Sequence, residues 1–303
     1  MISIIVCSID SKLLAEFSNS VITTIGVPYE ILSIDNLIFE YSIFEAYNYG
    51  VSISKFENLV FVHEDVIFHT KDWGKILLNY FNTLPDPGVM GVAGSSYLPI
   101  SPSDWWVSDS KYLHTNLLSN SKNGTVGQGD LMRNGQQVPT GVFALDGMFL
   151  ALRKSVWKEF SFDESLPGFH GYDTDICYQV TKKYRNYFIP GILLEHFSKG
   201  YPNLIWLRNT VYANRKILPF IHQMKIQNGF DSKLEIKAFH LFLGQLKKFG
   251  HSRFENIRLS ILYFNHLKSI GLFWKLLPLL LKYLFVFTFT IPFKSRNLNL
   301  QWR

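Results

Sequence analysis

The sequence predicts an α/β protein with a Rossmann-like, mostly parallel sheet flanked by helices, followed by a helical C-terminal appendage that is both basic and apolar. Of the 303 residues, 47% are hydrophobic and 18% are charged, which provides a large core and excludes a disordered chain. Short apolar runs alternate with segments of helical periodicity over the first two thirds of the chain, which is typical of βα repeats.

The charge distribution divides the chain into two predicted domains. Residues 215–303 contain 15 Lys and Arg and 3 Asp and Glu, a net charge of +12. The whole chain contains 30 and 24, so residues 1–214 keep 15 basic and 21 acidic residues, a net charge of −6. We therefore predict an α/β domain over residues 1–214 and a helical domain over residues 215–303.

Strands and helices of the first domain follow from these patterns in order. Runs rich in β-branched and aromatic residues predict strands at Ile2–Cys7, Tyr29–Ile34, Leu59–Val62, Val89–Ala93, Phe143–Leu152 and Tyr187–Leu194, the last interrupted by Pro190 and Gly191. Apolar residues at helical spacing predict helices at Leu13–Ile25, Tyr41–Ser54, Trp73–Phe81, Val156–Phe160 and Tyr172–Tyr184.

The segment Ser95–Pro139 breaks the alternation, because it is rich in Ser, Asn, Gly, Pro and Trp. We expect a long loop that is functional or mobile. Trp105 and Trp106 are candidates for stacking against the flat face of a ligand such as a sugar ring, and anchoring of the loop in the core is an equally good interpretation.

Several protein classes are excluded. The two cysteines, Cys7 and Cys177, do not make a disulfide framework and fit a reducing, cytoplasmic setting. The first eight residues lack the basic flank of a signal peptide and are predicted to be a strand. The turn after that strand, Ser8–Ser11, has no G-x-G-x-x-G pattern and the chain has no P-loop motif, which argues against dinucleotide-binding Rossmann enzymes and P-loop NTPases.

The C-terminal region is apolar and basic at once. Its most hydrophobic stretch, Leu272–Phe293, contains Lys275 and Lys282, which favours a segment lying in the membrane interface over one that spans the bilayer. The alternative is a helical subdomain that packs on the first domain or forms a homodimer with a second copy of the chain. Nucleic acid is not expected as a partner, because the basic residues are mixed with Leu and Phe.

Polar residues follow three successive predicted strands. Ser8 and Ile9 follow the first strand, Asp35 and Asn36 the second, and His63, Glu64 and Asp65 the third. Each alone is an ordinary loop or capping residue. In open α/β sheets, however, ligands bind beyond the carboxyl ends of the strands, so together they predict one ligand site.

Three clusters could carry chemistry. The carboxylates at His63–Asp65 suit Mg²⁺ or Mn²⁺ with a nucleotide diphosphate. Asp173 and Asp175 begin a predicted helix, where they are either N-terminal capping acids or a general base. His196 follows the last strand and is a candidate metal ligand, which would favour Mn²⁺.

The order of these motifs resembles GT-A type nucleotide-sugar glycosyltransferases, and in particular the family 2 "glycosyltransferase-like" proteins that carry His-Glu-Asp-Val. The resemblance covers roughly residues 1–205. It includes the Asp after the second strand, the segment Ala46–Gly50, the acidic motif after the third strand, Asp146-Gly147, the acidic helix start and His196.

The resemblance implies roles on the nucleotide side of the site. Ser8 and Ile9 would border the base and ribose, and Asp35, with Asn36 beside it, would hydrogen-bond the uracil or ribose. Asn48 lies on the helix that carries a nucleotide-side asparagine in many relatives.

The resemblance also implies a metal site for Mn²⁺ or Mg²⁺. Asp65 matches the last aspartate of the DxD motif and would bind the metal, and His196 matches the histidine that completes the site. His63 stands where the motif has its first aspartate, and Glu64 lies between, so we count both as candidate cofactor-binding residues.

The resemblance also implies residues that bind the sugar and residues that carry out the reaction. Asp146 and Gly147 would line the donor or acceptor sugar. Asp173 matches the base of the family's Glu-Asp motif, where Tyr172 replaces the glutamate, and Asp175 is the alternative base.

The resemblance implies an inverting transfer from a UDP-sugar to a glycan or lipid-linked acceptor in surface polysaccharide synthesis. The enzyme would then work in the cytoplasm, at the inner face of the plasma membrane, with residues 215–303 on the lipid surface. Two other interpretations remain open at this point. One is a catalytically silent nucleotide-sugar-binding protein, and the other is a nucleotidyltransferase, although the first turn lacks the Gly and Arg that such an enzyme would use.

Overall fold

The computed structural model describes residues 1–119, 130–133, 138–197, 202–250 and 252–289. The chain divides into two compact units. Unit 1 consists of Met1–Tyr97 and Ser108–Tyr201, and unit 2 consists of Leu98–Val107 and Pro202–Arg303.

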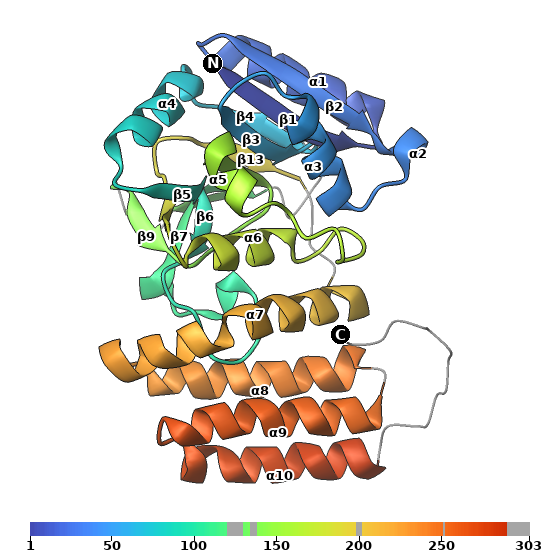
Figure 1. The fold of residues 1–303 in the computed structure, drawn as a ribbon, viewed down its shortest axis with the longest axis vertical. Coiled ribbons are helices and arrows are strands. Elements are labelled where there is room, and N and C mark those ends of the chain that lie inside the picture. The colour runs from blue at the N-terminus through green and yellow to red at the C-terminus, as the bar shows by residue number, and fades with distance from the viewer. Residues whose placement is uncertain (120–129, 134–137, 198–201, 251, 290–303) are drawn as a thin grey trace. The chain divides into compact units, whose positions relative to one another are not determined.

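Unit 1 contains a seven-stranded mixed sheet with the strand order β2-β1-β3-β11-β5-β12-β9. Figure 1 labels β1, β2, β3, β5 and β9 of this sheet. The strands that share one direction are β1 (Ile2–Ser8), β2 (Tyr29–Asp35), β3 (Asn58–His63), β5 (Pro87–Gly91) and β12 (Arg185–Phe188). Only β11 (Phe149–Arg153) and β9 (Thr140–Val142) run against their neighbours in this sheet. The predicted α/β class with a mostly parallel sheet is confirmed.

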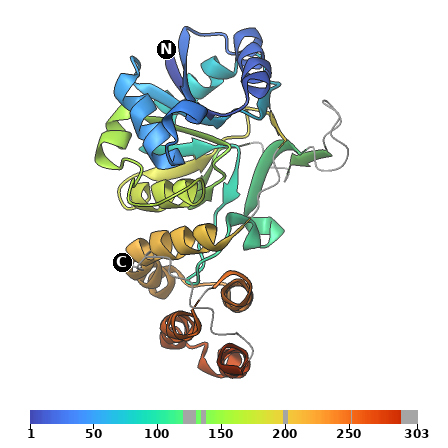
Figure 2. The same ribbon diagram turned by 90° about the vertical axis from the view of Figure 1, so that its right-hand side faces the viewer.

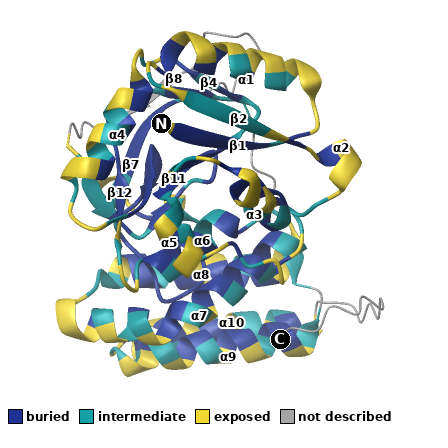
Figure 3. Cartoon of the chain, turned by 45° about the horizontal axis from the view of Figure 1, so that its top comes forward, coloured by how far each residue is buried: buried dark blue, intermediate teal, exposed yellow. Residues whose placement is uncertain are grey.

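The helices of unit 1 flank this sheet. They are α1 (Ser11–Thr24), α2 (Asn36–Phe39), α3 (Ile43–Ile53), α4 (Trp73–Thr83), α5 (Lys154–Glu159) and α6 (Tyr172–Val180). Asp10 caps α1, and Ser42 with Glu45 forms a capping box at the start of α3. β1 is almost entirely buried, as expected for a central strand covered on both faces, whereas α1 exposes its outer surface (Figure 3).

A second, six-stranded sheet corrects the loop predicted at Ser95–Pro139. It has the order β10-β6-β7-β13-β4, with β8 paired to β7. Its strands are β4 (Val66–Phe68), β6 (Ala93–Ser95), β7 (Leu113–Ser119), β8 (Asp130–Arg133), β10 (Ala144–Leu145) and β13 (Leu194–His196). Two 3₁₀ turns, Trp105–Val107 and Ser110–Tyr112, precede β7. The long-loop prediction was therefore wrong for β7 and β8, which pair with each other, while β7 also pairs with β6 and with the distant β13. Residues 120–129 and 134–137 lie outside the described residues.

Three other predicted elements are shorter in the structure. The strand predicted at Phe143–Leu152 is broken into β10 and β11, because Asp146 Oδ1 accepts a hydrogen bond from Met148 N and turns the chain there. The last predicted strand separates into β12 and β13 around Pro190 and Gly191, and α6 already ends at Val180.

Unit 2 contains α7 (Leu204–Asn228), α8 (Ser232–Phe249), α9 (Arg253–Ser269) and α10 (Phe273–Phe289). α8, α9 and α10 lie side by side (Figures 1 and 2). The predicted C-terminal helices are confirmed. None of the helices in the described part of the chain combines the length and the apolar character needed to cross a membrane.

The units divide at Tyr201/Pro202, whereas the charge pattern predicts a boundary at residue 214. Asn203 caps α7 by accepting a hydrogen bond from Trp206 N, and the helix then runs through residues 214 and 215 without a break. Leu98–Val107 joins unit 2 through Ile100, whose N–H donates to Glu235 Oε2 and whose carbonyl accepts from Asn214 Nδ2.

Candidate active site

The carboxyl ends of β1, β2 and β3 lie in register, as the sequence predicts. Ser8 pairs with Asp35 across the β1–β2 ladder, and Cys7 pairs with His63 across the β1–β3 ladder. The polar residues that follow the three strands therefore meet at one edge of the sheet.

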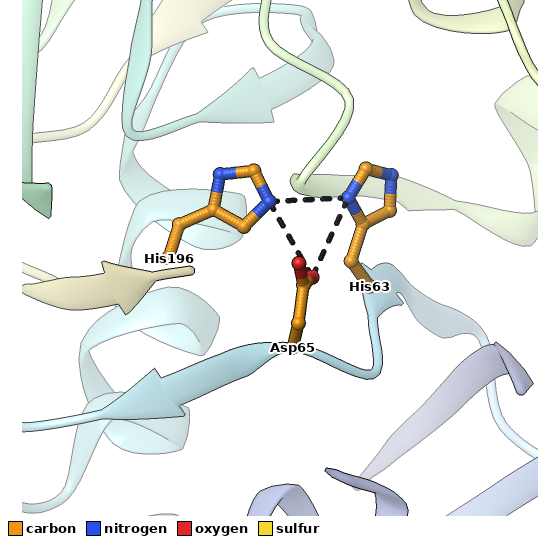
Figure 4. A group of neighbouring side chains, drawn as sticks. All are labelled: His63, Asp65 and His196. Atoms are coloured by element: carbon orange, nitrogen blue, oxygen red, sulfur yellow. Dashed lines mark hydrogen bonds and ion pairs between the residues drawn. The ribbon is translucent and has the colours of Figure 1, made fainter. Parts of the chain in front are cut away.

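His63, Asp65 and His196 form a cluster of possible metal ligands (Figure 4). His63 ends β3, Asp65 lies in the turn between β3 and β4, and His196 ends β13. The antiparallel pairing of β4 with β13 places His196 opposite Val66, and Phe197 N donates to the Asp65 carbonyl. Asp65 and His196, which are far apart in sequence, are thus neighbours because of strand pairing.

The three side chains direct their ligand atoms at one another. His63 Nδ1 lies 3.4 Å from His196 Nε2 and 3.9 Å from Asp65 Oδ1, and His196 Nε2 lies 3.4 Å from the same oxygen. One ligand atom from each residue lies within 4.8 Å of the others. A carboxylate and two imidazoles at this spacing fit one divalent cation, because they offer three lone pairs to a common point.

The charges in the cluster are uneven. Burial by itself raises the pKa of Asp65, but the hydrogen bond and the charge of His196 outweigh it and hold that pKa below its usual range. Burial by itself lowers the pKa of His196, but Asp65 outweighs it and raises that pKa. Burial and the charge of His196 lower the pKa of His63, which favours its neutral imidazole.

A second group lies next to this cluster. Asp173 Oδ2 accepts a hydrogen bond from Gly147 N at 3.1 Å, and Asp173 Oδ1 accepts one from Thr174 N at 2.7 Å. Burial and the negative charge of Asp146 raise the pKa of Asp173 to about 7. Asp146 also acts electrostatically on His63, so the two groups form one site.

Asp173 is better placed than Asp175 to act as a base. Asp173 is half-buried at the start of α6, whereas Asp175, two residues further along the helix, is only 2% exposed. A carboxylate whose pKa is near 7 is matched to proton transfer at neutral pH.

Glu64 organises the turn after β1. Its carboxylate accepts hydrogen bonds from Ile9 N and Asp10 N at 3.1–3.2 Å. Ser8 is buried at this turn, and Ile9 is exposed. Glu64 therefore holds the end of the first strand in place and links Ile9 and Asp10 to the His63–Asp65 turn.

At the end of β2, the exposed Asp35 caps α2, because its side chain accepts a hydrogen bond from Leu37 N. Asn36 closes the following loop through two hydrogen bonds with the backbone of Tyr41. Asp35 lies beside Ser8 at the sheet edge, whereas Asn36 has a structural role in the loop.

The structure does not place Asn48 with the other predicted residues. Its Nδ2 donates to the Phe162 carbonyl and to Glu164, and its Oδ1 accepts from Trp157 Nε1 and Phe162 N. An amide side chain makes about four hydrogen bonds at most, so none is left for a nucleotide. We therefore correct the predicted nucleotide role of Asn48 to that of holding the segment after α5.

Two contacts near the cluster were not predicted. The Tyr172 hydroxyl lies 2.5 Å from His63 Nε2. The buried Glu195 carboxylate pairs with His69 Nε2 at 2.9 Å and ties β13 to the end of β4. Neighbouring residues of a strand point to opposite faces, so Glu195 and His196 are directed away from each other, but the sequence carried no signal for the partner His69.

A mostly parallel α/β sheet whose strand ends carry an acidic and histidine cluster agrees with the GT-A type of glycosyltransferase that the sequence resembles. A family model described as "Glycosyltransferase like family" matches residues 3–204, more than half of the chain, and the chain belongs to that family. A comparison with curated proteins gives no match.

The solved structures that are similar to the chain include two that illustrate the range of the match. One is the crystal structure of GalNAc-T7 with UDP, GalNAc and Mn²⁺, at 13% identity and a TM-score of 0.48, covering 78% of this chain. This chain spans only 53%, about half, of that GalNAc-T7 chain. The other is residues 1–349 of S. aureus TarS, at 10% identity and a TM-score of 0.45, covering 86% of this chain and 88% of that one.

Proposed function

We propose that this glycosyltransferase moves a sugar from a nucleoside-diphosphate donor, a UDP-sugar, to a hydroxyl of a glycan or lipid-linked acceptor with inversion. The observation that carries the proposal is the His63–Asp65–His196 cluster beside Asp146 and Asp173 at the ends of parallel strands. Ligands of α/β sheets bind at this edge.

Asp65, His196 and His63 would hold a divalent cation, Mn²⁺ or Mg²⁺. When bound, such a cation neutralises charge on the diphosphate of the donor. The chain's own contribution is to fix these side chains: β4–β13 pairing sets Asp65 against His196, and Glu64 fixes the adjoining turn. Ser8, Ile9 and Asp35 then face the nucleoside side of the same edge.

Asp173 is the base in this proposal. It takes the proton of the acceptor hydroxyl while that oxygen forms a bond to the anomeric carbon, and the bond from that carbon to the diphosphate oxygen breaks with its electron pair. The backbone N–H groups of Gly147 and Thr174 keep the carboxylate in one orientation. Attack from the face opposite the leaving group inverts the anomeric centre.

Donor hydrolysis and transfer test the proposal. The purified chain is incubated with a panel of nucleotide sugars, with Mn²⁺, with Mg²⁺ and with EDTA, and release of the nucleoside diphosphate is measured. We expect release from a UDP-sugar that requires the cation, and NMR of the first-formed sugar should show the inverted anomer. Cation-dependent binding without any turnover would favour a silent nucleotide-sugar-binding protein.

We also propose that unit 2 attaches the enzyme to the inner face of the plasma membrane, where lipid-linked acceptors for surface polysaccharides are found. α10 exposes four large apolar side chains on one face: Trp274, Leu281, Phe285 and Phe289. Their spacing of seven, four and four residues gives one stripe along the helix. Lys275 and Lys282 flank the stripe, and α10 has no acidic residue.

Such a stripe is suited to the interface of an anionic bilayer, because the aromatic side chains insert and the lysines meet the lipid headgroups. The full chain should co-sediment with vesicles that contain phosphatidylserine and should be released by high salt. The double variant Phe285→Ser/Phe289→Ser should weaken binding by roughly 10–100-fold, whereas Phe254→Ser, an exposed phenylalanine on α9, should not. If the full chain ignores vesicles and the same double variant instead dissolves a homodimer, the membrane proposal is wrong.

A further inference from the structure

The chain departs from the motifs it resembles at two positions, and the structure brings those two positions into contact. His63 stands in place of an aspartate and Tyr172 in place of a glutamate. His63 Nε2 and the Tyr172 hydroxyl are 2.5 Å apart, although the residues are 109 positions apart in sequence. The two replacements therefore act as one unit.

Tyr172 is held rigidly in this contact. The residue is 4% exposed, and its ring packs against Phe44, Tyr47 and Phe162 at centroid distances of 5.5–6.3 Å. Gly147 makes room for the hydroxyl, since a Cβ at that position would lie only 2.1 Å from the Tyr172 oxygen. The hydroxyl cannot easily move away from His63.

The contact decides which nitrogen of His63 can bind a cation. A neutral imidazole carries its proton on one nitrogen and offers a lone pair on the other. Tyr172 occupies Nε2, on the side away from the cluster, while Nδ1 lies 3.4 Å from His196 Nε2. With the proton on Nε2, donated to the Tyr172 oxygen, the lone pair of Nδ1 is directed at the common point shared with Asp65 and His196.

We propose that Tyr172 is a positioning residue that holds His63 as a third cation ligand through Nδ1 and thereby makes the site selective for Mn²⁺ over Mg²⁺. This inference rests on the proposed function, since it concerns the same cation. Two imidazoles and one carboxylate suit a transition-metal ion, whereas Mg²⁺ prefers oxygen ligands and water. A hydrogen bond to the outer nitrogen of a ligating histidine fixes its tautomer and orientation.

The test measures cation binding directly rather than activity. Free Mn²⁺ is followed by EPR while it is titrated with protein in the presence of UDP, and Mg²⁺ is then used as competitor. Tyr172→Phe removes only the hydroxyl and keeps the ring packing. We expect it to weaken Mn²⁺ binding by roughly 10–100-fold, the usual effect of losing an outer partner of a ligating histidine, with little change for Mg²⁺.

Tyr187→Phe is the matched control. Tyr187 is also 4% exposed, and its hydroxyl donates to the Pro85 carbonyl, away from the cluster. This variant loses a buried tyrosine hydrogen bond just as Tyr172→Phe does, so it should retain Mn²⁺ affinity. Gly147→Ala, which pushes against the hydroxyl, should reproduce the loss with Tyr172 still present.

A direct readout of the tautomer completes the test. Long-range ¹H–¹⁵N spectra of the protein loaded with Zn²⁺ and UDP should show His63 bound through Nδ1 with its proton on Nε2. The inference is overturned if Tyr172→Phe binds Mn²⁺ as tightly as the wild type, or if Mg²⁺ loses as much affinity as Mn²⁺. In either case Asp65→Asn still reports on the proposed function, which fails separately if the wild type binds no Mn²⁺ at all.

Discussion

Two clusters of ionisable side chains, one in each unit, differ in burial and in how their polar atoms are paired. In unit 2, Lys225 Nζ and Glu235 Oε1 are 3.1 Å apart and both residues are almost fully buried. The second oxygen of Glu235 accepts the N–H of Ile100. In unit 1, His63, Asp65 and His196 are only half-buried and direct three ligand atoms at one another.

The difference lies in what each cluster still lacks. In the Lys225–Glu235 pair, a cation of the chain meets an anion of the chain, and the remaining oxygen meets a backbone donor. In the cluster of unit 1, three ligand atoms converge, and His196 is paired with the Asp65 carboxylate at 3.4 Å. The first arrangement is complete and structural, and we propose that an external cation completes the second.

Removing the base gives the largest expected effect on activity. Asp173→Asn should reduce turnover by roughly 10²–10⁴-fold, because the acceptor hydroxyl loses its proton acceptor, while donor affinity stays nearly the same. Steady-state kinetics with calorimetric donor binding measures both quantities. If Asp175→Asn is the inactive variant and Asp173→Asn turns over normally, the base is assigned to the wrong carboxylate.

Breaking the Lys225–Glu235 pair should lower the stability of the protein and leave cation binding at the His63–Asp65–His196 cluster unchanged. Lys225→Met leaves Glu235 buried without its partner and should lower the free energy of unfolding by about 3–5 kcal/mol. The double variant Lys225→Met/Glu235→Leu should recover most of that loss. Urea unfolding measures the stability, and Mn²⁺ affinity of the folded variants should equal that of the wild type. A loss of Mn²⁺ affinity in the folded Lys225→Met variant would contradict the separation of roles.

The pH dependence should follow Asp173. Its pKa is raised to about 7, so kcat/KM should fall about tenfold per pH unit below that value as the base becomes protonated. The same raised pKa means that the folded state holds the proton more tightly, so stability decreases as the pH rises from about 4 to about 7. Asp173→Asn should lose the acidic limb of the kinetic profile and gain relative stability at pH 8. If the activity of the wild type instead falls only near pH 4, burial and the charge of Asp146 do not raise the pKa of Asp173 as described.

Much of unit 1 could be predicted from the sequence. β1, β2 and β3 are apolar runs with polar residues directly after them, so their shared edge and the His63–Asp65 turn followed from local pattern alone. Local pattern could not show that β13 pairs with β4, which is what places His196 at Asp65. β7 was missed because it lies in a stretch rich in Ser, Asn, Gly and Pro. Only its pairing with β6, β8 and the distant β13 shows that Leu113–Ser119 is a strand.

The errors concern residues whose role depends on distant neighbours. Asn48 has the residue type of a nucleotide ligand, but four hydrogen bonds to α5 and the segment after it use its amide. In the sequence, Tyr172 is only the residue that replaces the motif's glutamate, and only the fold shows its hydroxyl at His63. The domain boundary was drawn where the charge changes, whereas α7 begins earlier, at the cap provided by Asn203.

The central claim is that the open cluster of unit 1 binds a cation together with the nucleotide. Isothermal titration calorimetry of UDP, in Mn²⁺ and in EDTA, tests it most directly on the wild type and on Asp65→Asn. We predict that EDTA weakens UDP binding to the wild type strongly, and that Asp65→Asn binds UDP weakly under both conditions, a loss larger than the roughly 10–100-fold typical of outer partners. UDP binding that is equally tight in EDTA, or unchanged in Asp65→Asn, would contradict the account.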